Sequence, residues 1–331
     1  MSKHFLKYAI VAFFLCLFGG CDFKPTTEFT KNQSFYYWKT IFRLTDTERK
    51  ILQNNDIDKL YIRFFDVGLV GNKVEPLGKI FFNEKPVQNV VPVVFIKNEI
   101  FYDKDLDIKN LASKTHQLIA KIASYNEILF DEIQIDCDWS LQTKAAYFLF
   151  LEELKKYHKK SISVTIRLHQ IKYAEQTGIP EVDSGVLMYY NIGKINADDK
   201  NSIYDREIAL KYIPFIKNYN LPLVTALPIF NWLVHLRNEQ VVQVIPKTDP
   251  NLIENLSEIK TGIFEVNSDT YFQNYTLKKG DQLKLESVPY TEIQTIVNDI
   301  NRYSELATQQ IIWYDLDEHN INWYKNETLF K

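Results

Sequence analysis

The residues of this chain best able to do chemistry lie in one short stretch that alternates apolar and polar side chains. Residues 130–139 read FDEIQIDCDW. On a β-strand, successive side chains point to opposite faces, so Asp136 and Asp138 would project together near the strand's end. Neighbouring carboxylates raise one another's pKa, which is what an acid/base pair needs. The pattern predicts an acid/base site, with Cys137 on the apolar face as a small buried side chain.

The elements around this stretch predict an α/β fold, a (β/α)8 TIM barrel. Eight strand-like runs recur with helical patterns between most of them, as in a barrel of parallel strands. They lie near residues 35–38, 60–65, 90–96, 132–138, 161–169, 186–191, 221–227 and 311–315. Helices are expected at 45–54, where Thr45 and Glu48 form a capping-box pattern, and at 107–124, 141–159 and 291–306.

The connection after the seventh strand is too long for a simple strand-helix-strand unit. It predicts a small α+β insertion at about residues 231–290 within a barrel domain of 35–331. Two hairpins are expected there, one turning at 238–239 and one at 278–281. An insertion at this point would border the strands' C-terminal ends, where barrel enzymes place their sites.

Cationic side chains are also expected at the mouth of the barrel. Arg167 and His169 would end the inward face of the fifth strand, and Arg63 lies near the end of the second. They are candidate substrate-binding residues beside the acidic pair. The alternative is a purely structural network in which the two arginines pair with Asp136 and Glu132.

The N-terminal residues 1–20 resemble a lipoprotein signal peptide. Lys3 and Lys7 precede the apolar run 8–18, and residues 17–21, LFGGC, resemble a lipobox whose Cys21 would carry lipid. Residues 21–34 would be a tether, and the protein a membrane-anchored lipoprotein of the cell envelope. An ordinary signal peptide with an incidental cysteine is the alternative.

Composition narrows the class of partner. The 331 residues carry a formal net charge of -3 and 46% hydrophobic side chains, which suits a globular protein and gives no sign of nucleic-acid binding. No tight His or Cys spacing predicts a metal site, and no glycine-rich phosphate loop predicts a cofactor. The lysine run 155–160 is expected to be a solvated helix end. The oligomeric state stays open.

Four segments, in order, resemble motifs of the family-eighteen glycoside hydrolases, the chitinases and endo-β-N-acetylglucosaminidases. Residues 130–138 resemble the fourth-strand signature of that family. MYYN at 188–191, LPIF at 227–230 and IWYD at 312–315 resemble its sixth-, seventh- and eighth-strand motifs. The resemblance implies a barrel with an insertion after strand seven, and a glycan containing N-acetylhexosamine as partner.

The resemblance also implies roles for single residues. Asp138 would be the general acid and base, and Asp136 would orient the substrate's N-acetyl group, whose carbonyl attacks the anomeric carbon. Tyr190 and Asn191 would be hydrogen-bond partners, and Trp313 would lie under the scissile sugar. This substrate assistance removes the need for a second carboxylate as nucleophile.

Departures from the family pattern keep other functions open. Asp138 stands where the family has Glu, and a displacement on the order of 1 Å can cost about a hundredfold in rate. A non-catalytic carbohydrate-binding barrel would instead depend on aromatic side chains such as Trp313 and Trp232. A hydrolase of another mechanism would pair Asp138 with Asp66 or Asp315.

Overall fold

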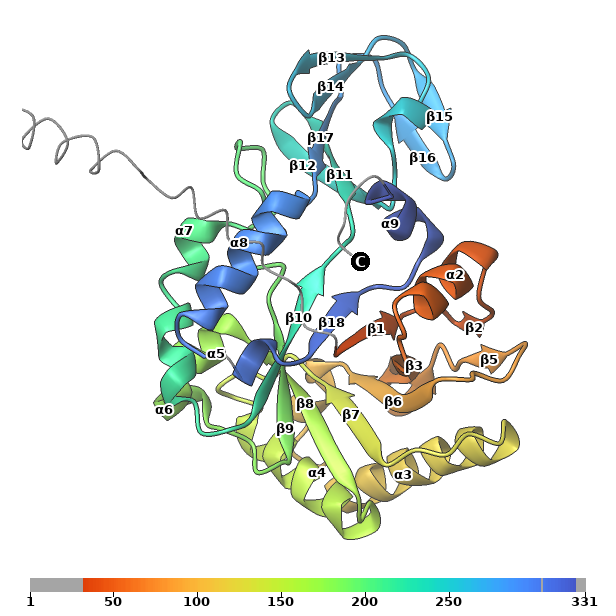
Figure 1. Ribbon diagram of the computed structural model, residues 1–331, viewed down its shortest axis with the longest axis vertical. Coiled ribbons are helices and arrows are strands. Elements are labelled where there is room, and N and C mark those ends of the chain that lie inside the picture. Colours follow the sequence, from red (N-terminus) through yellow and green to blue (C-terminus); the bar gives the residue numbers. More distant parts are fainter. Residues whose placement is uncertain (1–31, 305, 326–331) are drawn as a thin grey trace, which may run out of the picture.

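The structure, a computed structural model, describes residues 32–304 and 306–325, and its core is a closed barrel of eight parallel strands (Figure 1). The sheet order is β1-β18-β10-β9-β8-β7-β6-β3, and β1 also pairs with β3, which closes the ring. The predicted (β/α)8 barrel is confirmed. The barrel strands are β1 (Gln33–Tyr37), β3 (Lys59–Val70), β6 (Asn89–Ile96), β7 (Glu132–Asp136), β8 (Ser161–Arg167), β9 (Ser184–Met188), β10 (Leu223–Pro228) and β18 (Ile311–Tyr314).

Helices connect most of these strands, close to the positions that the sequence predicts. The capping box of α2 is confirmed, because the Glu48 backbone N–H donates to Thr45 Oγ1 at 3.3 Å and the Thr45 N–H donates to the Glu48 carboxylate at 3.0 Å. The helices are α2 (Asp46–Asn54), α3 (Ile108–Tyr125), α4 (Lys144–Tyr157), α5 (Leu168–Lys172), α6 (Ala174–Thr177), α7 (Arg206–Ala209), α8 (Tyr290–Asn301) and α9 (Glu318–Trp323).

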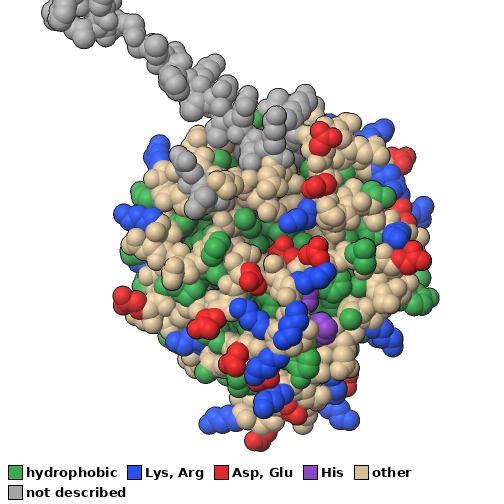
Figure 2. Space-filling view, turned by 60° about the horizontal axis from the view of Figure 1, so that its bottom comes forward, with side chains coloured by type: hydrophobic (Ala, Val, Ile, Leu, Met, Phe, Trp, Pro, Cys, Tyr) green, Lys and Arg blue, Asp and Glu red, His purple; other side chains and the backbone are tan. Residues whose placement is uncertain are grey.

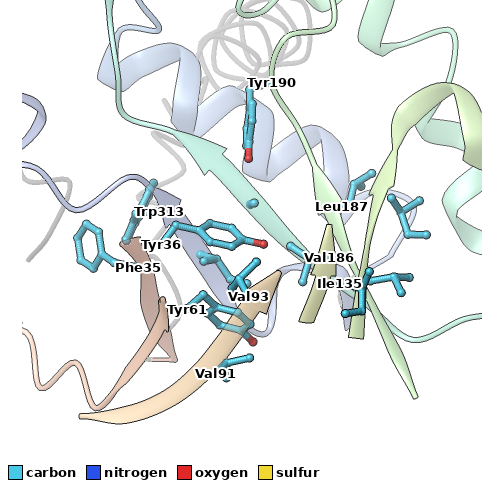
Figure 3. Close-up of a cluster of buried hydrophobic side chains, with 14 of the residues drawn as sticks. Phe35, Tyr36, Tyr61, Val91, Val93, Ile135, Val186, Leu187, Tyr190 and Trp313 are labelled. Carbon is cyan, nitrogen blue, oxygen red and sulfur yellow. The ribbon is translucent and has the colours of Figure 1, made fainter. Parts of the chain in front are cut away.

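The barrel interior is unusually polar, because hydroxyl, amide and carboxylate groups alternate with the apolar residues that face the helices. The Tyr36 hydroxyl donates to the Gln134 side chain at 2.6 Å, and the Ser163 hydroxyl donates to Glu132 at 2.6 Å. Figure 3 shows Tyr36 and Tyr61 among the buried aliphatic side chains. The first of these bonds crosses the barrel from β1 to β7, and the second joins the adjacent strands β8 and β7.

The segment between β10 and α8 forms a separate antiparallel sheet with its own small core. The sheet order is β12-β11-β17-β14-β13, and its core comprises Leu233, Ile245, Ile253, Val266, Leu277 and Leu283. Its strands are β11 (Trp232–Arg237), β12 (Gln240–Pro246), β13 (Leu256–Lys260), β14 (Ile263–Val266) and β17 (Gln282–Glu286), and a separate hairpin joins β15 (Thr270–Phe272) and β16 (Tyr275–Leu277).

The two predicted hairpins of this segment have different outcomes. The first is confirmed: β11 pairs with β12, and Asn238 and Glu239 have φ of 50° and 59°, as a primed two-residue turn requires. The second is wrong, because β16 pairs with β15 and β17 lies between β11 and β14. Leu283 of β17 is fully buried in the small core, so packing between distant strands decides the pairing.

Two buried charges hold this sheet to the loop that follows β9. Lys284 Nζ donates to the carbonyls of Asn196, Asp198 and Lys200 at 3.0, 2.8 and 3.0 Å. Glu286 accepts from the Ser202 backbone N–H at 3.2 Å, and its carboxylate lies 2.8 Å from Lys284 Nζ. The loop from β9 to α7 is therefore fastened to the inserted sheet.

Candidate active site

A hollow of about 220 Å³ opens at the C-terminal ends of the barrel strands. Its walls come from β1, β6, β7, β8, β9 and β18, whose paired residues place side chains of matching parity inside the ring. The lining residues are Tyr36, Trp38, Phe95, Asp136, Asp138, Thr165, Arg167, Met188, Tyr190, Asn191 and Tyr314. This is the end of a barrel at which enzymes of this architecture place their sites.

The two carboxylates predicted from the alternating stretch both line this hollow. Asp136, at the end of β7, is 6% exposed and accepts a hydrogen bond from the Thr165 hydroxyl at 2.7 Å. Asp138, two residues further along, lies nearer the opening, with its side chain 46% exposed, and forms an ion pair with Arg167. One acid therefore lies deep in the hollow and the other at its rim.

Burial makes the deeper acid a group that titrates near neutrality. Removal from water raises the pKa of Asp136 to about 6, while the Thr165 hydroxyl opposes the shift by stabilising the charged form. The neighbouring Asp138 raises this pKa further, and Arg167 lowers it. Asp136 can consequently hold or release a proton in mildly acidic solution.

Aromatic rings form the wall facing the acids. Tyr314 stacks on Tyr190, with ring centroids 5.0 Å apart, and contacts Trp38 and Tyr36 with centroids 5.7 and 5.6 Å away. The hydroxyl of Tyr190 is buried and has no hydrogen-bond partner within the part of the chain that the structure describes. An unsatisfied buried donor on this wall is available to a ligand group.

Three predicted substrate-binding residues do not line the hollow. Arg63 forms a two-pronged pair with Asp66, through Nε and Nη2 at 2.7 and 2.5 Å. His169 is on the short helix α5 with its side chain open to solvent; partial loss of hydration and the positive charge of Arg167 lower its pKa. Trp232 donates its indole N–H to Glu286 at 2.8 Å.

Trp313 has the wrong parity for its predicted place under a sugar. It is fully buried, and its indole N–H donates to the Gln33 side chain at 2.7 Å. Because Trp313 pairs in register with Phe35, it faces the helices, as Figure 3 shows for these two residues. The next residue, Tyr314, faces the hollow instead.

The alternatives involving other charged residues are not matched by the contacts. Arg63 pairs with Asp66, and Arg167 with Asp138, so the alternative network with Asp136 and Glu132 is not formed. Asp315 is buried and bound to Lys247 at 2.9 Å, outside the hollow. Among the described lining residues, the acids are Asp136 and Asp138 alone.

Several lining residues were not singled out from the sequence, namely Tyr36, Trp38, Phe95, Met188 and Tyr314. The alternation of side chains along a strand could have identified three of them. Tyr36 and Trp38 are two residues apart and so share a face, and Phe95 lies beside Asp136 on the neighbouring strand. Within residues 32–304 and 306–325, no group of three or more His, Cys, Asp or Glu residues could hold a metal ion. No helix in the same ranges is long and apolar enough to cross a bilayer. Cys21 lies outside them.

Comparisons with solved structures show the same fold at low sequence identity. The spore cortex-lytic enzyme SleL of Bacillus cereus is similar with a TM-score of 0.51 and 13% identity, over 86% of this chain and 70% of that one. A class V chitinase from Nicotiana tobaccum gives 0.51 and 10%, over 90% and 97%. A chitinase-like agglutinin from Robinia pseudoacacia gives 0.50 and 13%, over 90% and 98%.

The distant resemblance to family-eighteen glycoside hydrolases is therefore confirmed, and what it shows is a shared glycoside-hydrolase-like fold. A variant of the Nicotiana chitinase has been solved in complex with NAG4. No protein-family model matches the sequence, and no curated protein matches it.

Proposed function

We propose that this protein hydrolyses a glycan containing N-acetylhexosamine, with Asp138 as general acid and base and Asp136 as its partner. The observation that carries the proposal is the position of both carboxylates in one aromatic-lined hollow at the barrel mouth. The aromatic wall suits the flat apolar faces of sugar rings. The oligosaccharide bound by the Nicotiana chitinase variant supports this class of ligand.

The proposed reaction proceeds in two steps and uses the substrate's own acetamido group. Its carbonyl oxygen attacks the anomeric carbon, the glycosidic C–O bond breaks, and the leaving oxygen takes a proton from the carboxyl of Asp138. The Asp138 carboxylate then removes a proton from water, which attacks the same carbon and regenerates the acetamido group. In this scheme the acetamido group is the nucleophile, so neither of the two acids that line the hollow has to attack the sugar.

Two neighbouring groups would orient the acetamido group. Asp136, with its pKa raised by burial to about 6, would bind the acetamido N–H as an acceptor. The buried Tyr190 hydroxyl would donate to the acetamido oxygen, which would give it the partner it lacks among the described residues. Asn191, exposed at the rim, would contact a sugar hydroxyl.

The test is mass detection of products from N-acetylhexosamine oligomers, peptidoglycan fragments and N-glycans. The Asp138→Asn variant should lose at least a hundredfold in turnover, because it cannot donate the proton, with little change in unfolding temperature. Asp131→Asn is the matched control, since Asp131 belongs to the same segment but is exposed and paired with Lys160. Unchanged turnover in the Asp138 variant would rule out this assignment.

A second candidate function is glycan binding without turnover, and one contact favours it. Arg167 occupies an oxygen of Asp138, and this acid is one methylene shorter than the family's Glu. It would have to turn from the guanidinium to reach a glycosidic oxygen. Replacing Trp38 or Tyr314 with Ala should then weaken glycan binding in calorimetry, while no glycan in the panel is cleaved by the unaltered protein.

We further propose that the protein is a lipoprotein of the cell envelope, anchored through Cys21. The lipobox-like residues 17–21 and the preceding apolar run support this. Intact-mass measurement of protein extracted from membranes should reveal an acylated N-terminal Cys21. A mature chain that begins at another residue would contradict the anchor without bearing on hydrolysis.

A further inference from the structure

The end of the barrel opposite the hollow carries large apolar side chains in the open. Three loops there precede β6, β7 and β8 and cover residues 83–88, 126–131 and 158–160. Val87 and Leu129 in these loops and Tyr125 at the end of α3 are 90%, 92% and 87% exposed. Single exposed apolar residues are ordinary, but three on adjoining segments make an unpartnered surface. We call these three loops, with the ends of α3 and α4, the base patch.

Contacts between the loops show that the base patch is one continuous surface. Lys85 Nζ donates to the Glu127 carboxylate at 3.0 Å, which joins the first loop to the second. Lys160 Nζ donates to the Phe130 carbonyl at 3.1 Å and pairs with Asp131, which joins the second to the third. Figure 2, which turns the bottom of Figure 1 forward, shows Lys and Arg side chains interspersed with acidic and hydrophobic ones on that face.

Five lysines and five acids lie on the base patch, and two of the lysines are outside its ion pairs. The exposed acids Glu127 and Asp131 are each paired with a lysine of a neighbouring loop. Lys156 is shared between two glutamates of α4. Lys155 and Lys159 form no ion pair within the described part of the chain. Lysines around exposed Tyr and Leu side chains match the headgroup layer of an anionic bilayer, where long cationic side chains reach toward phosphate.

The point at which the chain enters the barrel favours a bilayer as the partner of the base patch. Because all eight strands are parallel, Gln33 at the start of β1 lies at the same end of the barrel as the base patch. Eleven residues, 22 to 32, separate Cys21 from that strand. Even when fully extended, this segment reaches at most about 40 Å. A lipid on Cys21 would therefore hold this end near the membrane.

We propose that the base patch rests on the surface of an anionic bilayer, so that the hollow with Asp136 and Asp138 faces away from the membrane. Val87, Tyr125 and Leu129 lie at headgroup level and Lys155 and Lys159 face the anionic lipids. The proposal rests on the lipid anchor proposed above, but not on hydrolysis.

The test uses the full acylated chain in vesicles of phosphatidylethanolamine and phosphatidylglycerol at 3:1. A fluorophore on a Leu129→Cys variant should be quenched by lipid-bound nitroxides at least threefold more than the same fluorophore on Tyr271→Cys. Tyr271 is the matched control, because it is 71% exposed on β15 of the separate β15–β16 hairpin. Cys137 is buried and should not compete for the label. Equal quenching at both positions would overturn the proposal.

A charge reversal separates headgroup contact from simple tethering. Lys155→Glu with Lys159→Glu should reduce the quenching at position 129 by at least half while the chain still floats with the vesicles. Val87→Cys serves as a second labelled position in case the first variant unfolds. Loss of flotation in the unaltered chain, or quenching unaffected by the reversal, would refute the arrangement. Glycan cleavage measured on the same samples reports separately on the proposed function.

Discussion

Two buried aspartates of this protein have opposite surroundings. Asp281 of the inserted sheet is 2% exposed and accepts two hydrogen bonds from Arg237, at 2.8 and 2.7 Å, and one from His235 at 2.7 Å. Asp136 in the barrel hollow is 6% exposed and accepts from the Thr165 hydroxyl at 2.7 Å. Opposite charge and several donors lower the pKa of Asp281, whereas burial raises that of Asp136 to about 6.

The difference separates a structural carboxylate from the one that we propose to act on the substrate. The neighbours of Asp281 supply further hydrogen bonds: the backbone N–H of Lys278 donates to its carboxylate at 2.7 Å, and the Gln243 side chain lies 3.1 Å from the other ring nitrogen of His235. The charged carboxylate therefore stabilises the inserted sheet. Burial makes the charged form of Asp136 unfavourable and so raises its pKa. Raised pKa values of this kind are typical of sites that transfer a proton near neutral pH.

The largest expected effect on stability comes from neutralising the structural aspartate. Asp281→Asn should lower the free energy of unfolding by about 3 kcal/mol at pH 7, because the buried His235 and the guanidinium of Arg237 lose their shared anion. Urea denaturation measures it. Asp269→Asn is the control, since Asp269 pairs with Lys278 on the exposed surface and should change stability by less than about 1 kcal/mol. Equal losses in both variants would erase the distinction.

The same substitution at Asp136 should change the free energy of unfolding in the opposite direction. The pKa of Asp136 is about 6 in the folded protein, above its value in the unfolded chain. The stability that the protonated carboxyl contributes is therefore fully present below the unfolded pKa and is lost as the pH rises through about 6. Asp136→Asn should therefore be more stable than the unaltered protein at pH 7, by about 2 kcal/mol, and equally stable near pH 3. Denaturation at both pH values measures this.

A destabilised Asp136→Asn at pH 7 would mean that the charged carboxylate is required structurally. Asp131→Asn again provides a control, because Asp131 is exposed and paired with Lys160. It should follow the unaltered protein across the same pH range, which excludes an effect of net charge alone.

Much of the barrel could be predicted from the sequence because its signals are local. Each strand is a run of apolar or alternating residues, and the parity of residues 132–138 alone placed Asp136 and Asp138 inside the ring. The capping box at Thr45 and the primed turn at Asn238 are local patterns of the same kind. The two acids of the candidate site could thus be predicted from the sequence alone.

The rest depended on contacts between distant residues or on a single step of register. Trp313 and Tyr314 are adjacent aromatic residues, so an error of one position exchanges the wall of the hollow with the packing against the helices. The pairing of β17 between β11 and β14 is set by packing. No sequence period encodes these choices.

The smallest expected effect tests how Asp136 is held. Thr165→Val removes a hydroxyl that donates to this carboxylate while keeping the side chain's shape. Since that hydrogen bond favours the charged form, the pKa of Asp136 should rise further above its present value of about 6. Stability at pH 7 should fall by about 1 kcal/mol, and less near pH 3, where the carboxyl is protonated. Carbon-13 NMR titration of the Asp136 carboxyl measures the shift. Thr165→Ser keeps the hydroxyl and should leave the titration near that of the unaltered protein. If Thr165→Val does not change the titration, the hydroxyl does not stabilise the anion. The pKa of Asp136 would then be set by burial and by the Asp138–Arg167 pair.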